Sequence, residues 1–189
     1  MRRPLAVALL AVALATAGAA TAGVGPFAEP PDVRITDEPP DGVLWPFLND
    51  SARTDETIHV GASASGGSEA VGFVVENDGP DTSVPLTVVH RPTNETIVDR
   101  TISMPTDTAA VIVFHRPAAY RVTVDTAQGT AVYPVERSAF DCNDRSLGVR
   151  IEEGGQTAFT SISTSMACPS LPGEPFEDTL TVGPAQVFE

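Results

Sequence analysis

The sequence predicts an all-β protein, an antiparallel β-sandwich with a hairpin at its C-terminal end. From Thr57 onward, apolar and polar residues alternate with a period of two, which places side chains on opposite faces of a strand. Turn-forming residues interrupt this alternation at close intervals, and no stretch has the 3.6-residue apolar period of an amphipathic helix. We therefore expect one sandwich of about 110 to 130 residues, long enough to bury a single hydrophobic core.

Each expected strand is supported by its own alternation. Ile58 shares a face with Val60, and Phe73 shares a face with Val75 in the next strand, which ends at the turn sequence of residues 77–80. Further strands are expected at 84–90, 96–104, 109–114, 120–125 and 130–136. Turn-forming or helix-breaking residues separate them, at 91–95, 105–107, 116–117 and 127–129.

The N-terminus has the pattern of an export signal. Arg2 and Arg3 supply positive charge, residues 5–15 form an apolar core, and residues 20–22 read Ala-Thr-Ala, a cleavage-site pattern. We expect residues 1–22 to be a signal peptide, with no lipid attachment because no cysteine follows the apolar core. The alternative is an uncleaved membrane anchor, because residues 5–22 carry no charge and about 18 residues is the lower limit for crossing a bilayer.

The charge balance indicates a salty environment. The chain has no lysine, and its 25 carboxylates outnumber its 11 arginines, which gives a net charge of -14 at pH 7. Removal of residues 1–22 leaves nine arginines and a charge of -16. Molar salt screens such a surface, so we expect a protein of a halophile that repels nucleic acid and anionic lipid. A codon bias toward GC is the competing explanation, but it accounts only for the missing lysine.

Residues 23–55 are expected to form a proline- and acid-rich lead-in segment, because prolines interrupt any long regular element. Within it, Val33–Ile35 has the pattern of an edge strand, and residues 43–48 are apolar enough to pack on a domain. Trp45 is the single tryptophan. It is either an exposed contact residue that stacks on a sugar or a partner, or a hydrophobic plug over one end of the sandwich.

Two segments carry a resemblance to a known family. Residues 73–79 read Phe-Val-Val-Glu-Asn-Asp-Gly and lead into an apolar strand at 84–89, and Tyr120 begins a Tyr-Arg-Val-Thr-Val strand. Over residues 56–136 the chain resembles CARDB-type immunoglobulin-like adhesion domains of archaeal and bacterial surface proteins. The resemblance implies an immunoglobulin-like sandwich, which we place at residues 56–170, followed by an acidic tail at 171–189. The tandem repeats of that family are missing here, so a filament or stalk is not implied.

Cys142 and Cys168 are the two cysteines, and they flank an expected hairpin centred on Gly154 and Gly155. Residues paired in an antiparallel hairpin have a constant sum of numbers, and a three-residue loop at 154–156 makes that sum 310, which places the two cysteines opposite each other. In an exported chain we expect a disulfide that closes hairpin 142–168. A redox or metal site is the alternative, but the chain lacks a Cys-x-x-Cys pair. Residues 141–144 and 166–168 also resemble an arrangement in haloarchaeal secreted proteins, which implies no activity.

The sequence lacks the common catalytic, phosphate-binding and dinucleotide-binding motifs, so we expect no enzyme, no cofactor and no metal. His90 and His115 both precede Arg-Pro. They are either strand-end residues or two ligands of a zinc or copper ion that a carboxylate completes. The acidic residues at 141–144 and 152–153 are either solvated surface or a weak calcium site.

Two asparagines match the acceptor pattern for N-glycosylation, Asn49 and Asn94. Asn94 is the better candidate because it lies in an expected hairpin loop, where an enzyme can reach it.

Together these observations predict a non-enzymatic, secreted or cell-surface immunoglobulin-like module of a halophilic archaeon, located outside the cell or in its envelope. Its expected partners are envelope proteins or glycans, contacted through loops, with membrane contact only if residues 1–22 are retained. One alternative is a carbohydrate- or solute-binding module in which Trp45 and Tyr120 or Tyr133 form a stacking platform. Another is a small hydrolase, which requires a concave pocket with converging carboxylates or histidines.

Overall fold

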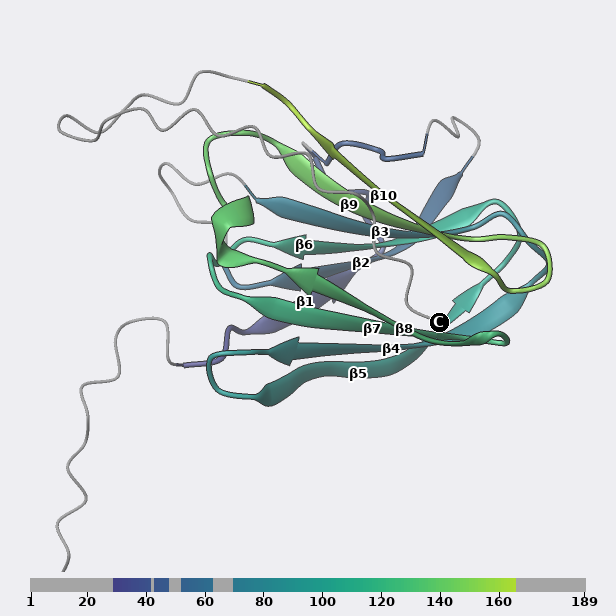
Figure 1. Cartoon of the computed structure of the whole chain (residues 1–189), viewed down its shortest axis with the longest axis horizontal. Coiled ribbons are helices and arrows are strands. Elements are labelled where there is room, and N and C mark those ends of the chain that lie inside the picture. The colour runs from purple at the N-terminus through teal and green to yellow at the C-terminus, as the bar shows by residue number, and fades with distance from the viewer. Residues whose placement is uncertain (1–28, 42, 48–51, 63–69, 166–189) are drawn as a thin grey trace, which may run out of the picture.

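The computed structural model describes residues 29–41, 43–47, 52–62 and 70–165. Apart from one 3-10 turn, η1 (Arg137–Ala139), its regular structure forms two β-sheets that face each other as a sandwich (Figure 1). The six-stranded sheet has the order β1 (Val33–Thr36), β2 (Arg53–Val60), β6 (Thr108–Phe114), β3 (Val71–Asn77), β9 (Arg145–Ile151) and β10 (Thr157–Ser163). The four-stranded sheet has the order β5 (Glu95–Met104), β4 (Thr82–His90), β7 (Tyr120–Thr126) and β8 (Gly129–Val135).

The all-β prediction is confirmed, and so is the two-layer arrangement. The five strands expected between residues 84 and 136 are present, with bounds that differ by at most two residues from those predicted. The edge strand expected at Val33–Ile35 is also present, because β1 pairs antiparallel with β2. Two further pairings are parallel, β2 with β6 and β3 with β9, so the six-stranded sheet is mixed rather than antiparallel throughout.

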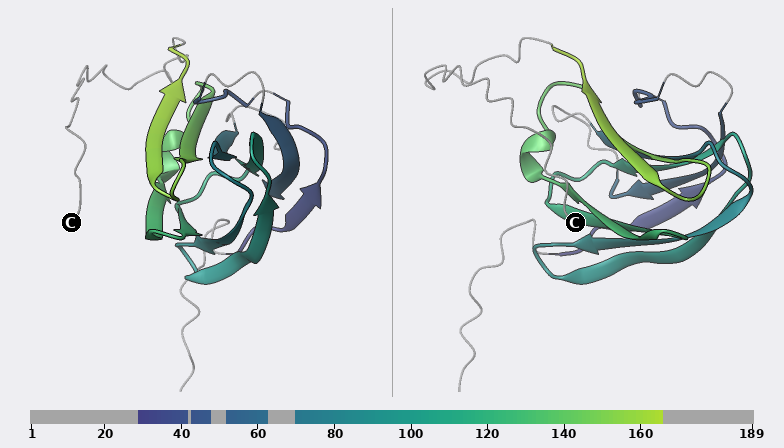
Figure 2. Two further views of the ribbon diagram at one scale, coloured as in Figure 1. Left: turned by 90° about the vertical axis from the view of Figure 1, so that its right-hand side faces the viewer. Right: turned by 45° about the vertical axis from the view of Figure 1, so that its right-hand side comes forward.

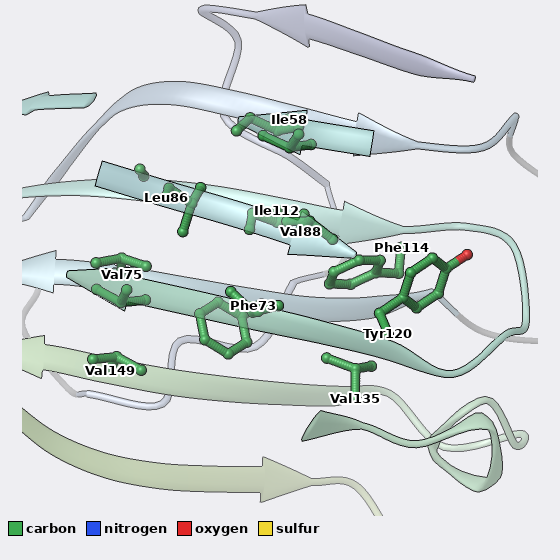
Figure 3. Close-up of a cluster of buried hydrophobic side chains, with 14 of the residues drawn as sticks. Ile58, Phe73, Val75, Leu86, Val88, Ile112, Phe114, Tyr120, Val135 and Val149 are labelled. Atoms are coloured by element: carbon green, nitrogen blue, oxygen red, sulfur yellow. The ribbon is translucent and has the colours of Figure 1, made fainter. Parts of the chain in front are cut away.

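The main hydrophobic core lies between the two sheets (Figure 3). It is built from the alternate residues that the period of two predicts, since every second side chain of a strand points to the same face. Phe73 of β3 and Ile112 of β6 meet Leu86 and Val88 of β4, and each of these side chains is at most 1 % exposed.

A second apolar cluster covers the outer face of the six-stranded sheet. Every residue of β3 and β6 is buried, although one face of a two-layer sandwich normally meets water. The cover is supplied by residues 43–47, which we call the belt. Val43 and Trp45 of the belt pack on Val74 and on outward-facing residues of β6. The lead-in segment is therefore part of the folded sandwich.

Two glycines allow the belt to approach the sheet closely. A Cβ atom at Gly148 would lie 2.7 Å from both Pro46 and Phe47, and one at Gly72 would lie 2.8 Å from Val43. Both distances are shorter than real Cβ contacts, so larger residues at these positions would displace the belt. The guanidinium of Arg150 lies 4.4 Å from the centre of the Phe47 ring, which adds a cation–π contact to the packing.

The hairpin of β9 and β10 has a register that differs from the predicted one. Ile151 pairs with Thr157 and Arg145 pairs with Ser163, so the paired residues sum to 308 and not to 310. The loop has the expected three residues but lies one residue earlier, at 153–155, closed by a bond from the Glu152 amide to the Gln156 carbonyl. The last residue of such a three-residue loop adopts positive φ, a conformation that glycine takes easily. In the observed loop this residue is Gly155 (φ 81°), whereas the predicted loop would have placed Gln156 there. The described part of the ladder therefore has a sum two lower than predicted, whereas the pairing of Cys142 with Cys168 stays a prediction because Cys168 lies outside the described residues.

Tyr120 fixes the corner where the chain enters β7. Its ring is fully buried in the core and lies 4.5 Å from that of Phe114, centre to centre. Its hydroxyl, visible at the edge of the core in Figure 3, donates a hydrogen bond to the carbonyl of Arg116, four residues earlier, at 2.8 Å. Burial raises the pKa of Tyr120, an effect that the charge of Arg116 partly offsets.

Candidate interaction surface

One side of the sandwich is formed by the edge strands of both sheets. β8 ends the four-stranded sheet and β10 ends the six-stranded sheet, on the side away from β1 (Figure 2). Neither strand includes a charged residue, since their sequences are GTAVYPV and TAFTSIS. Edge strands normally carry charges that discourage pairing with other chains. Two uncharged edges in a chain with 25 carboxylates single out this surface, which we call the β8–β10 side.

Stacked aromatic rings join the two sheets on the β8–β10 side. The ring centres of Tyr133 and Phe159 are 5.1 Å apart, and the ring planes differ by 17°. Phe159 points toward the interior because it pairs with Val149, a core residue of β9. Tyr133 continues the contact inward to Phe73, with ring centres 5.8 Å apart. The stack thus extends from the core to the surface.

Hydrogen bonds between two turns hold these edges in position. Thr126, at the end of β7, donates to the carbonyl of Gly155 at 2.9 Å. Gln128, in the turn before β8, donates from Nε2 to the carbonyl of Gly154 at 2.8 Å. Both glycines have positive φ, so their backbone takes a course that other residues rarely adopt. The turn of each hairpin therefore fixes the other.

Exposed apolar side chains occur on both edge strands of this side. Among the described residues, four large apolar side chains are exposed, and three of them lie on β8 and β10: Val132 (54 % exposed), Phe159 (51 %) and Ile162 (39 %). The fourth is Ile35 on β1, at the opposite edge of its sheet. Apolar surface beside the free edge of a strand is what a protein offers when it binds another strand.

The opposite side of the sandwich is charged. There, Arg100 of β5 donates to Glu56 of β2 at 2.8 Å, and this ion pair joins the two sheets. β5 also carries Glu95 and Asp99, and β1 carries Arg34. These charges protect the edges at β5 and β1 against the addition of another strand.

The aromatic residues of the predicted stacking platform lie in three different places. Trp45 is partly buried against the outer face of the six-stranded sheet, as part of the belt. Tyr120 is 0 % exposed in the core, so it is not available to a ligand. Tyr133 stacks on Phe159 at the β8–β10 side. The platform of Trp45 with Tyr120 or Tyr133 is therefore not formed, and Trp45 covers a sheet face rather than an end of the sandwich.

Asn94, the better glycosylation candidate, lies at the turn between β4 and β5. It adopts the left-handed conformation (φ 55°), its amide donates to the carbonyl of Arg91, and it is exposed together with Glu95 and Thr96. All three residues of the acceptor pattern are thus accessible. Asn49, the other candidate, lies outside the described residues.

Cys142 lies in the segment between η1 and β9 and is partly buried. Cys168 lies outside the described residues. The hairpin ladder continues past Arg145 to a bond from the Thr164 amide to the carbonyl of Asp144, also with a sum of 308. The disulfide remains a prediction.

His59 and His115 lie side by side, a pairing that the sequence did not predict. His59 Nδ1 and His115 Nε2 are 3.0 Å apart, at hydrogen-bonding distance. Burial is the main cause of the lowered pKa of both imidazoles; Arg34 lowers the pKa of His59 further, and His59 and then Arg34 lower that of His115. The rings line a pocket of about 320 Å³ together with Asp32, Arg34, Gly61 and Ala62.

His115 directly follows β6, and the last residue of β4 is His90, so both are strand-end residues, as one of the two alternatives predicts. His90 is buried at the end of β4, where its Nδ1 lies 2.9 Å from the hydroxyl of Thr93 and its ring packs on that of Tyr120. Burial is the main reason for its lowered pKa; Arg116 adds to the shift and Glu95 opposes it. These contacts indicate a structural role for His90.

The two groups of acidic residues named as a weak calcium site do not meet. Asp141 and Asp144 precede β9, whereas Glu152 and Glu153 follow it, so the length of a seven-residue strand separates them. Asp141 also accepts hydrogen bonds from the Asn143 amide and from Arg145. Within residues 29–41, 43–47, 52–62 and 70–165, no three His, Cys, Asp or Glu side chains gather as a metal site.

A second pocket, of about 260 Å³, opens at the end of the sandwich opposite the histidine pair. Asp81 and Glu152 line it, but Asp81 is engaged with the amide and hydroxyl of Thr106. The side chain of Asn77 donates to three backbone carbonyls beside the pocket and supports the loops around it. These contacts describe a polar support for loops rather than a catalytic arrangement.

Comparison of the chain with models of protein families and with curated proteins gives no match. In the part of the chain that the structure describes, no helix has the length and apolar character needed to cross a membrane.

Proposed function

We propose that this protein is a non-enzymatic contact module of the cell envelope of a halophilic archaeon, and that its β8–β10 side binds a protein partner. The observation that carries the proposal is the pair of uncharged edge strands with exposed Val132, Phe159 and Ile162. An acidic chain that charges its other edges and leaves these two uncharged retains a surface for contact.

The partner that fits this surface is an extended, uncharged strand of another protein. Among the described strands, none pairs with the outer edge of β10, so its backbone groups can accept a further strand, and Phe159 and Ile162 offer apolar contacts beside it. Apolar contacts do not lose strength by electrostatic screening, whereas surface ion pairs do, so such an interface suits molar salt.

A charge placed on either edge tests this assignment. Ser161→Glu adds a carboxylate to exposed β10, and Thr101→Glu adds the same carboxylate to exposed β5 as the matched control. We expect pull-down from envelope fractions in molar salt to recover a specific protein with the wild type and with Thr101→Glu, but not with Ser161→Glu. Equal recovery by all three proteins, or by none, would contradict the proposal.

The alternative is a carbohydrate-binding module, for which the half-exposed ring of Phe159 beside Tyr133 is the favourable observation. The same pull-down separates the two functions. Material that is retained by wild type and lost after periodate oxidation of its sugars would identify a glycan partner.

Export and halophilic adaptation are part of the proposal and rest on the sequence. A signal peptide at residues 1–22 predicts that the protein isolated from its host begins at Gly23, which N-terminal sequencing would check; a chain that keeps residues 1–22 would be anchored. The net charge of -14 predicts loss of structure, followed by circular dichroism, when salt falls from molar to about 0.1 M.

An immunoglobulin-like fold is also proposed. The order β5-β4-β7-β8 and the hydrogen bond from Tyr120 to Arg116 support it, because immunoglobulin-like domains have a similar sheet and a tyrosine with such a bond at the start of a late strand. The parallel pairings of β2 with β6 and β3 with β9 depart from that pattern. An experimental structure of a bound or free domain would decide the classification by its connections.

We further propose the disulfide between Cys142 and Cys168. The ladder of β9 and β10 supports the bond, because it continues to Asp144 and Thr164, two residues after Cys142. Titration of the unfolded, non-reduced protein should find no free thiol, and two free thiols would exclude the bond.

We propose a glycan at Asn94, where the whole acceptor pattern is exposed. The intact mass of protein from its native host should exceed that of the chain by a glycan, and Thr96→Ala should remove the difference. Persistence of the added mass in Thr96→Ala would assign it elsewhere.

A further inference from the structure

We propose that the strand bound by β10 is β10 of a second copy of this chain, so that two molecules join through an antiparallel pair of these strands about a twofold axis. The pairing rests on the proposed function, because it names the partner of the β8–β10 side. β10 itself meets the description of that partner: it is extended, uncharged and lies at the edge of its sheet (Figure 2).

Of the two uncharged edges, β10 is the one suited to pairing. β8 contains Pro134, which has no N–H to donate, and a proline in an edge strand faces the free edge. A strand added to β8 would therefore lack a hydrogen bond at Pro134. β10 contains neither proline nor glycine, and its register with β9 is continuous over Thr157–Ser163.

The hydrogen bonds of the β9–β10 hairpin determine which residues of β10 face its free edge. The Glu152 amide donates to the Gln156 carbonyl near the turn, and farther along the ladder the Thr164 amide donates to the Asp144 carbonyl. Even-numbered residues therefore bond across this hairpin. Bonded and non-bonded positions alternate in an antiparallel ladder, so the odd-numbered residues of β10 direct their backbone groups away from β9. These residues are Thr157, Phe159, Ser161 and Ser163.

Full overlap of the two copies defines a single register. When Thr157 of one copy lies opposite Ser163 of the other, every residue of β10 is paired and Thr160 lies opposite itself on the twofold axis. The odd-numbered residues then pair with one another, because the paired numbers sum to 320. Their outward N–H and C=O groups meet and exchange about eight hydrogen bonds.

The side chains of β10 are complementary in the same register. Residues that lie opposite each other share a face of the joined sheet. Phe159 lies opposite Ser161 of the second copy on the inner face, and Ile162 lies opposite its Ala158 on the outer face. Each large apolar side chain thus meets a small one, and the contact reduces the exposure of Phe159 and Ile162.

The charge distribution along the chain favours this contact in brine. No charged residue occurs from Gly154 to Gly173, whereas the whole chain carries 25 carboxylates and 11 arginines. The net charges of two copies repel each other, but molar salt reduces the Debye length to about 3 Å. A single pair of strands is a small interface, so we expect a reversible dimer with a dissociation constant of about 10–100 μM.

The first test measures the dimer of the protein as its host exports it, in molar KCl. Sedimentation equilibrium should show a monomer–dimer equilibrium. Ser161→Glu places a carboxylate against Phe159 of the second copy and should weaken dimerisation by about tenfold or more. Thr101→Glu, the same change on exposed β5, is the matched control and should dimerise as the wild type does.

A cysteine on the twofold axis tests the register. Thr160→Cys places two thiols at a non-hydrogen-bonded pair, where Cα atoms are about 4.5 Å apart, which is within the range of a disulfide. Mild oxidation should cross-link this variant, and peptide mapping should locate the bond between the two introduced thiols. Ser163→Cys is the control, because its two thiols would lie about 20 Å apart along the strands and should not cross-link.

Three results would overturn the pairing: a monomer at every concentration up to about 1 mM, dimerisation that is unchanged in Ser161→Glu, or equal cross-linking of Thr160→Cys and Ser163→Cys. Circular dichroism shows whether each variant is folded, and the two cysteine variants decide the question if Ser161→Glu is unfolded. A monomeric chain that recovers a different envelope protein through β10 would reject the pairing and keep the proposed function. A monomeric chain that recovers no protein would reject both.

Discussion

On the β5 side the two sheets are joined by an ion pair, whereas on the β8–β10 side they are joined by stacked aromatic rings. Glu56 and Arg100 form the first connection, with 16 % and 36 % of their side chains exposed. Tyr133 and Phe159 form the second. Both solve the same structural problem, the closure of a sandwich along an open side, but they respond to salt in opposite ways.

The difference shows how one chain can prevent other strands from pairing with one of its edges and allow such pairing at another. A charged edge repels added strands and is hydrated, while an uncharged edge with exposed apolar groups attracts them. High salt weakens the ion pair but leaves the aromatic contact. In brine, the β8–β10 side is therefore the more constant of the two connections and also the more adhesive surface.

The largest effect is expected from removal of the aromatic connection. Tyr133→Ala loses the contacts with Phe73 and Phe159 and should lower the free energy of unfolding by about 2 kcal/mol, less than a fully buried ring because Tyr133 is partly exposed. Tyr133→Phe keeps the ring and is the control. Chemical denaturation in molar salt measures both, and equal loss in the two variants would mean that the hydroxyl, not the ring, joins the sheets.

Tyr120, which is buried in the core between the two sides, tests a contact that neither edge makes. Tyr120→Phe removes the hydrogen bond to the Arg116 carbonyl, worth about 1 kcal/mol of stability. The raised pKa of Tyr120 means that above pH 10 the unfolded chain loses this proton while the folded chain keeps it, so stability falls as pH rises. The variant should show a flatter fall in denaturation midpoint between pH 9 and 11, and an unchanged slope would contradict the assignment.

The ion pair should show its salt dependence directly. Arg100→Ala leaves the partly buried Glu56 without this partner and should cost about 1 kcal/mol at the lowest salt that keeps the fold, with the cost shrinking toward zero in molar salt. Arg91→Ala is the matched control, because Arg91 and Glu136 form an ion pair that is about half exposed. A loss for Arg100→Ala that does not change with salt would mean that packing, not charge, closes this side.

The smallest effect on stability is expected from the surface ring. Phe159→Ser removes a side chain that is 51 % exposed and should cost about 0.5 to 1 kcal/mol. Its effect on partner binding should be much larger than its effect on folding. Val132→Ser, a change at similar exposure without a stacked ring, should cost less, as measured by the same denaturation curves.

The strands were predictable because their information is local. The alternation at Val71–Val75 and the turn residues that follow it can be recognised from neighbouring residues alone. The structure has β3 at this alternation, and the strand ends at Asn77. The partner of each strand is not local information. Nothing in the sequence of β2 indicates that it lies parallel to β6, so the contact between His59 and His115 could not be predicted.

The candidate surface was missed for a similar reason. Phe159 was recognised as part of a hairpin, but its contact with Tyr133 depends on two edges from different sheets lying on one side. The absence of charge in β8 and β10 was the signal in the sequence that could have found it. The hairpin register shows how sensitive pairing is to the turn, because a loop that lies one residue earlier than predicted changes the sum of the paired residue numbers from 310 to 308.

The belt constrains the order in which the chain is completed. Pro46 and Phe47 rest on Gly148, about one hundred residues later in the sequence, and Arg150 covers the ring of Phe47. A chain that emerges N-terminus first presents the belt long before β9 exists to receive it. We therefore expect this early segment to complete its packing only after β9 has joined the sheet.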